Sequence, residues 1–118
     1  MTTRDIGVWG EETAQKYLKK KGYKIKERNY RSRFGEIDII AEKGDLLAFV
    51  EVKLRKNADF GGACEYVIYA KQRKLRATAE IWLAEHGADK ALQFDVIEIY
   101  APLGAGKSFE LNHIENAF

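Results

Sequence analysis

The sequence predicts one domain of the α/β class, residues 1–118, with a three-layer core. Apolar residues recur at helical spacing in two stretches, near the start of the chain and again after residue 66. Short runs that alternate apolar with charged residues lie between and after these stretches, which is typical of half-buried strands. A chain of 118 residues can bury one such core and is shorter than chains that divide into domains.

The first helix is expected over residues 6–21, with Gly22 as its C-terminal cap. The apolar stripe that predicts it consists of Val8, Ala14, Tyr17 and Leu18. Glu11 lies near the start of this helix and beside the stripe, so its side chain can face the predicted sheet. An acid in this position can also simply complement the helix N-terminus.

Three strands are expected next, over residues 23–30, 36–41 and 46–54. The second and third are joined by a short segment in which Gly44 stands beside Asp45, the residue types that a tight hairpin turn requires. We therefore expect these two strands to pair antiparallel.

The predicted hairpin can bring Asp38, Glu51 and Lys53 together. Residues i and i+2 of a strand share a face, which puts Glu51 with Lys53, and Asp38 with Glu36 on the neighbouring strand. Carboxylates on rigid strands suit Mg²⁺, with Mn²⁺ as a substitute, and a lysine beside the ion suits phosphate chemistry. The alternative is an amphipathic hairpin whose charges are merely solvated.

The remaining elements complete the predicted layers. A loop over residues 55–63 leads to a second helix over 66–85 that ends at Gly87, and a strand follows over 92–100. The helix residues expected to face the sheet are Leu75, Ala79, Trp82 and Leu83. In the last strand we expect Phe94, Val96 and Ile97 to be buried and Asp95 to have a structural role.

Residues 101–108 imitate a phosphate-binding loop but have Ala101 in place of its first glycine. The ten residues after Ser108 cannot supply the helix, strand and acid of a nucleotide-hydrolysing domain. We therefore interpret residues 102–108 as a hairpin loop into a last short strand, and we expect no nucleotide or organic cofactor.

The residues of the predicted hairpin resemble the PD-(D/E)XK nuclease superfamily, with Asp38 as the first acid and Glu51-Val52-Lys53 as the (D/E)XK element. A narrower resemblance, to the YraN-type family, covers almost the whole chain. The motifs that carry it are Gly7-Val8-Trp9-Gly10-Glu11, Tyr17-Leu18, Arg28-Asn29-Tyr30-Arg31, Gly35-Glu36-Ile37-Asp38, Phe49-Val50-Glu51-Val52-Lys53, Arg55, Lys71, Phe94-Asp95-Val96 and Asn116-Ala117-Phe118.

The resemblance implies a restriction-endonuclease-like fold similar to archaeal Holliday junction resolvases, with a mixed central β-sheet flanked by α-helices. It implies that Asp38 and Glu51 bind the metal and that the Val52 carbonyl adds a third ligand. It further implies that Lys53 is the catalytic lysine and that Glu11 is the acid on the first helix. Gln93 and Leu54 depart from the usual pattern, which affects the expected substrate contacts more than the chemistry.

Basic residues are concentrated between residues 16 and 33, although the net charge is only +2. Aromatic residues are interleaved with them, as on surfaces that bind phosphates and stack bases. The residues predicted to bind nucleic acid are Lys19, Lys24, Arg28, Arg31 and Arg33, together with Arg55 and Lys71 from the family pattern. The alternative is a solvated helix end followed by a charged edge strand.

The sequence therefore predicts a Mg²⁺-dependent endonuclease that cleaves DNA, selective for a structure such as a junction or flap. The alternatives are a non-catalytic nucleic-acid-binding or scaffold protein that keeps the fold, and, less favoured, a protein-interaction module. Resolvase-like nucleases act as dimers, so a homodimer is implied. The single cysteine, Cys64, and the absence of a long apolar run or secretory signal predict a cytoplasmic protein away from membranes.

Overall fold

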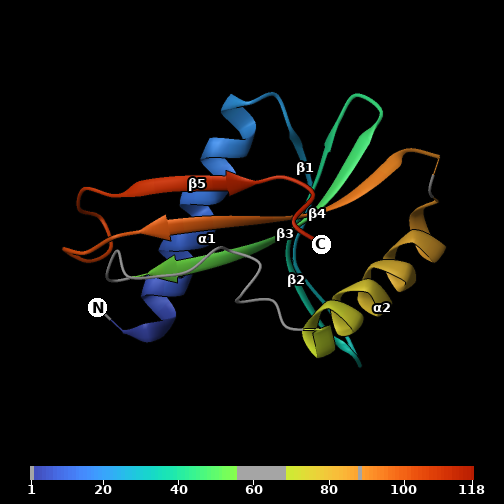
Figure 1. Cartoon of the computed structure of the whole chain (residues 1–118), viewed down its shortest axis with the longest axis horizontal. Helices are drawn as coiled ribbons and strands as arrows, with labels where there is room; N and C mark the ends of the chain where they lie inside the picture. Colours follow the sequence, from blue (N-terminus) through green and yellow to red (C-terminus); the bar gives the residue numbers. More distant parts are fainter. Residues whose placement is uncertain (1, 56–68, 88) are drawn as a thin grey trace.

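The computed structural model describes residues 2–55, 69–87 and 89–118 (Figure 1). Its elements, in chain order, are α1 (Thr3–Lys20), β1 (Lys24–Ser32), β2 (Gly35–Lys43), β3 (Leu46–Arg55), α2 (Tyr69–His86), β4 (Ala91–Tyr100) and β5 (Glu110–Ile114). The predicted loop over 55–63, Cys64 and the predicted start of the second helix lie, except for Arg55, outside the described residues.

The five strands form one mixed sheet in the order β1-β2-β3-β4-β5. β3 and β4 are parallel and are connected through α2, whereas the other neighbouring pairs are antiparallel. The structure is thus α/β, as predicted, and is consistent with a restriction-endonuclease-like three-layer fold. In the described part of the chain, neither helix is long and apolar enough to cross a bilayer.

The two helices cover opposite faces of the sheet, which gives the three layers. Ala14 and Leu18 of α1 pack with Ile39, Val50 and Ile97. The α2 side chains in the second core are Leu75, Ala79 and Trp82, as predicted, and they pack with Ile40, Phe49, Phe94 and Val96. Because neighbouring strand residues point to opposite faces, β4 is buried along most of its length and contributes to both cores.

α1 begins three residues before the expected start because its N-terminus is capped. The Thr2 hydroxyl accepts a hydrogen bond of 3.1 Å from the Asp5 N–H, and Asp5 Oδ2 accepts one of 3.1 Å from the Thr2 N–H. At the other end, Gly22 has φ of +95°, a value that glycine adopts without strain, and it ends the helix where predicted.

The β2–β3 hairpin is antiparallel, as predicted, and turns through Gly44 and Asp45, with φ of +58° at Gly44. Its register runs from Lys43 opposite Leu46 to Ile39 opposite Val50. Beyond this point β2 continues beside β1 and β3 continues beside β4. Figure 1 shows the consequence: β1 and β2 curve toward the start of α2, while β3, β4 and β5 extend the other way. The two halves of the sheet therefore separate between Asp38 and Glu51.

Candidate functional site

The separation of β2 from β3 places Asp38 beside the backbone of the outer half of β3. Asp38 Oδ2 accepts a hydrogen bond of 2.8 Å from the Val52 N–H, so this N–H points toward β2. The N–H and C=O of one strand residue point to the same side, and the Val52 carbonyl therefore faces the same gap. Two of the predicted metal ligands, the Asp38 carboxylate and the Val52 carbonyl, thus converge there.

Glu51 follows Val50 at the same point and is only 8% exposed. Its Oε1 accepts a hydrogen bond of 2.8 Å from Lys71 Nζ on α2, and it lies 4.0 Å from Lys53 Nζ on its own strand. The structure thus brings Asp38, Glu51 and Lys53 to one site. Lys71, which was predicted as a phosphate contact, lies inside the site rather than on its periphery.

The site strongly perturbs the protonation of Asp38. The pKa of Asp38 is raised to about 7, and burial of its carboxyl is the largest cause. The negative charge of Glu51 adds to this rise, as do those of Glu11 and Glu36, while the Val52 hydrogen bond opposes it. An excess of negative charge in a desolvated setting is what a bound cation would relieve.

The two lysines respond in opposite ways. Burial lowers the pKa of Lys53, and the positive charge of Lys71 lowers it further. Burial also acts to lower the pKa of Lys71, but the hydrogen bond and charge of Glu51 outweigh it and the net shift is upward. Lys71 is thus held charged against Glu51, while Lys53 is the more readily deprotonated of the two.

Asn29 holds two further carboxylates near Asp38. Its Nδ2 donates hydrogen bonds of 2.8 Å to Glu11 Oε1 and 3.1 Å to Glu36 Oε1. Its φ of +53° interrupts the extended backbone of β1, a conformation that asparagine tolerates better than most residues. Glu11 of α1 thus approaches the site, as predicted. Sequence reasoning missed the role of Asn29, although an asparagine inside a strand was a usable signal.

The predicted nucleic-acid-binding residues do not form one patch. Arg28 contacts Glu11 at 3.5 Å, and Arg31 contacts Glu36 at 3.4 Å, so both border the carboxylates. Arg33 lies in the turn between β1 and β2, and Arg55 ends β3. The other two are distant from the carboxylates. Lys24 lies opposite Glu42 in the β1–β2 register, near the far end of β2, and Lys19 is in the last turn of α1.

A second group of potential ligands lies on the α1 face of the sheet. Ligand atoms of Asp95, His113 and Glu115 lie within 4.8 Å of one another and could hold a metal ion. The fully buried Asp95 accepts hydrogen bonds of 2.8 Å from His113 Nε2, 3.1 Å from Gln93 Nε2 and 2.9 Å from the Asn116 N–H. The other ring nitrogen of His113 lies 3.0 Å from the Tyr17 hydroxyl. These contacts agree with the structural role predicted for Asp95.

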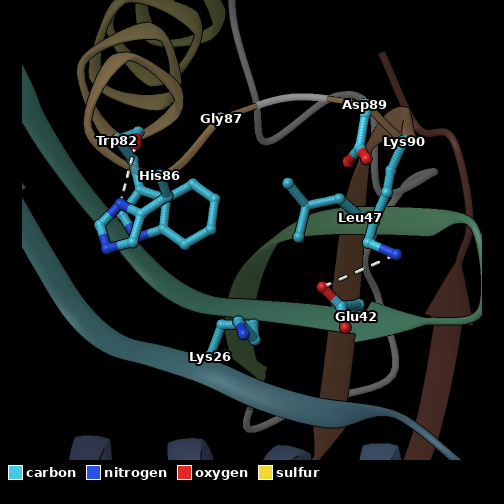
Figure 2. A pocket seen from close by; sticks show the side chains of 8 residues that line it. All are labelled: Lys26, Glu42, Leu47, Trp82, His86, Gly87, Asp89 and Lys90. Atoms are coloured by element: carbon cyan, nitrogen blue, oxygen red, sulfur yellow. Dashed lines mark hydrogen bonds and ion pairs between the residues drawn. The ribbon is translucent and has the colours of Figure 1, made fainter.

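A cavity of about 150 Å³ lies at the opposite end of α2 from Lys71. Figure 2 shows Trp82 and His86 stacked on one side of it, with ring centroids 4.1 Å apart, and the Lys90–Glu42 ion pair on the other. The charged residues that line it carry both signs, and none of Asp38, Glu51 and Lys53 is among them. It is therefore separate from the carboxylate site.

The model of the uncharacterised protein family UPF0102 matches residues 10–99. A UPF0102 protein of Alkaliphilus oremlandii is 45% identical over 118 residues and one of Syntrophomonas wolfei is 44% identical over 116, each match covering 98% of both chains. A UPF0102 protein of Clostridioides difficile is 42% identical over the full length of both chains. The chain therefore belongs to the uncharacterised protein family UPF0102.

Proposed function

We propose that this protein is a Mg²⁺-dependent endonuclease that cleaves phosphodiester bonds in DNA at a branched or otherwise distorted structure. The observation that carries the proposal is the meeting of Asp38, Glu51 and Lys53 where β2 leaves β3. Two carboxylates and a lysine at a gap in a sheet suit phosphoryl chemistry better than they suit a solvated surface, since Glu51 is buried.

The donor set fits a hard divalent cation. Asp38 and Glu51 would hold it with the Val52 carbonyl, all oxygen donors of the kind that Mg²⁺ prefers. The raised pKa of Asp38 is the supporting observation, because it reports a carboxylate that is buried and lies beside the negative charge of Glu51. When bound, such an ion stabilises the charge that develops on phosphate oxygens during hydrolysis.

The protein's own groups would carry the rest of the reaction. Lys53 lies 4.0 Å from Glu51, where it would hold either the attacking water or a phosphate oxygen. Lys71, released from Glu51 when substrate enters, can hold a neighbouring phosphate. Arg28 and Arg31 border the carboxylates and would contact the phosphate backbone, which positions a strand without reading its bases.

A cleavage assay tests the proposal. We would incubate the protein with labelled linear duplex, single strand, flap and four-way junction DNA, and with RNA copies of each, in Mg²⁺ or Mn²⁺. Asp38→Asn and Lys53→Ala are the test variants. Lys107→Ala, an exposed lysine in the β4–β5 loop, is the control. We expect metal-dependent cleavage by the native protein and the control, reduced at least about 100-fold in both test variants.

The same assay separates the main alternative. A nucleic-acid-binding or scaffold protein would bind the branched DNA and leave every strand intact, and Asp38→Asn would bind as tightly as the native chain. If all four proteins bind the DNA and none cleaves it in either metal, the nuclease proposal is wrong and the scaffold alternative is supported. The affinity for each DNA is measured at two salt concentrations, because contacts to phosphates weaken as salt rises.

A further inference from the structure

A pocket of about 370 Å³ opens between the turn that joins β1 to β2 and the first half of α2. It is lined by Phe34 from the turn and by Ala70, Arg73, Lys74 and Ala77 from α2. The four helix residues follow a three- and four-residue spacing and therefore lie on one face of α2. The pocket thus has the Phe34 ring on one side and, on the other, a helix face that carries two alanines and two basic residues.

The turn is fixed in place although Phe34 is 42% exposed. Ser32 Oγ lies 2.8 Å from the hydroxyl of the buried Thr78 on α2, and it accepts a hydrogen bond of 3.0 Å from the Phe34 N–H. Gly35 approaches the helix closely, since a Cβ there would lie 3.7 Å from Lys74 Cβ. Phe34 therefore presents its ring to the pocket from an anchored backbone.

The chemistry of the pocket selects a flat, apolar group that carries negative charge nearby. The alanines leave room against the ring, and Arg73 and Lys74 supply positive charge at the rim. The Arg33 guanidinium lies 4.8 Å from the Phe34 ring centroid and adds to this charge. Among the described lining residues none is acidic. A nucleobase with its flanking phosphates has these properties.

The pocket is next to the candidate site. Lys74 lies three residues after Lys71, so the two project from neighbouring turns of α2, about 4.5 Å apart along its axis. Lys71 in turn contacts Glu51. A strand whose backbone passes the carboxylates can therefore place a nearby base over Phe34.

We infer that this pocket binds one unpaired nucleobase of the substrate, stacked on Phe34 and held by Arg73 and Lys74. The inference rests on the proposed function and narrows its substrate class. In an intact duplex every base is paired and stacked, so the pocket can be filled only by a single strand, a flap or a base displaced at a branch point.

Equilibrium binding without metal, in EDTA, tests the pocket independently of cleavage. We would measure the fluorescence anisotropy of a labelled single-stranded oligonucleotide and of a blunt duplex of the same sequence. The variants are Phe34→Ala, Phe34→Trp and, as the matched control, Phe109→Ala, an aromatic residue of 45% exposure that lines a different pocket. Thermal unfolding of each variant checks that the fold is retained.

We expect Phe34→Ala to weaken single-strand binding roughly tenfold and duplex binding less than about twofold. Phe34→Trp should bind single strands at least as tightly as the native chain, and Phe109→Ala should match it. An abasic nucleotide, placed where it weakens binding most, should lower the affinity of the native protein about tenfold. It should leave the affinity of Phe34→Ala almost unchanged, since both changes remove the same stacking contact.

Three results would overturn the pocket. The first is an unchanged affinity of Phe34→Ala for single strands, and the second is an equal loss of its affinity for single strand and duplex. The third is a native dimer, seen by light scattering, that Phe34→Ala dissociates while its affinity for nucleic acid stays unchanged. The proposed function fails separately. If the native protein never cleaves but Phe34→Ala loses single-strand affinity, the pocket stands and the nuclease does not. If cleavage occurs and single-strand binding ignores Phe34, the reverse holds.

Discussion

Lys71 Nζ on α2 lies 2.8 Å from Glu51 Oε1 on β3, although 20 residues separate them along the chain. This ammonium group occupies a carboxylate oxygen that a cation would need. Lys71→Met should therefore raise the affinity for Mn²⁺ by roughly three- to tenfold, because it removes a competing positive charge beside the site. Isothermal titration measures the change.

Lys74→Met is the matched control for the Lys71 variant, since it removes the same charge one helical turn away, at an exposed position. It should leave Mn²⁺ affinity nearly unchanged. Weaker Mn²⁺ binding in Lys71→Met than in Lys74→Met would show that Lys71 supports the site instead of competing for it.

Asp38→Asn should stabilise the fold at high pH. The folded pKa of Asp38 is about 7, against the ordinary value of 3.8, so between these values the folded state binds more protons than the unfolded state. The free energy of unfolding therefore falls as pH rises through this window. Asparagine carries no charge, and its advantage over aspartate should grow by up to about 3 kcal/mol between pH 4.5 and pH 8.

Urea denaturation in EDTA at both pH values measures the effect of Asp38→Asn. Asp45→Asn, at the exposed hairpin turn, is the control and should show the same stability difference at both. An equal gain for Asp38→Asn at pH 4.5 and pH 8 would mean that the carboxylate is not desolvated in the folded protein.

Asp95 should support the fold through hydrogen bonds and not through a bound ion. Its carboxylate accepts from His113, Gln93 and the Asn116 N–H, so Asp95→Ala leaves buried donors without partners and should cost roughly 2 to 4 kcal/mol of unfolding free energy. Chelation can lower the Tm by emptying the proposed carboxylate site, but this change should be the same in the native protein and in Asp95→Ala. A fall in Tm with EDTA that Asp95→Ala abolishes would instead identify a structural metal at this group.

Two glycines of α1 should respond differently to alanine. A Cβ at Gly7 would meet nothing within 4 Å, so Gly7→Ala should stabilise by about 0.5 to 1 kcal/mol through helix propensity. A Cβ at Gly10 would lie 2.9 Å from Leu54 Cδ1, and Gly10→Ala should lose that gain or destabilise. Adding Leu54→Ala to Gly10→Ala should relieve the contact, which a double-mutant cycle by urea denaturation would reveal.

Local sequence patterns predicted much of the fold. The alternation around Asp38 and Glu51 and the glycine at residue 44 were sufficient for the hairpin and for its antiparallel pairing, because strand period and turn chemistry are local properties. The stripe of α2 was likewise sufficient for Leu75, Ala79 and Trp82.

The features that the sequence did not predict all depend on contacts between residues that are distant in the sequence. Where β2 leaves β3 depends on how both halves of the sheet pack, so the Val52–Asp38 hydrogen bond could not be inferred from a pattern. The Lys71–Glu51 contact requires the docking of α2, and the bond from Asn29 to Glu11 requires the docking of α1. The unusual φ of Asn29 is similarly imposed by its tertiary setting.

The strand order has a kinetic consequence. Neighbours in the sheet are also neighbours in the chain, and β3 and β4 alone among the described strands must find each other across a helix. Loop-closure entropy favours the short hairpins, so we expect Asp38 and Glu51 to be aligned early, while the β3–β4 pairing and Lys71 arrive together in a slower step. A partly folded chain would then hold its acids side by side before the lysine that neutralises them.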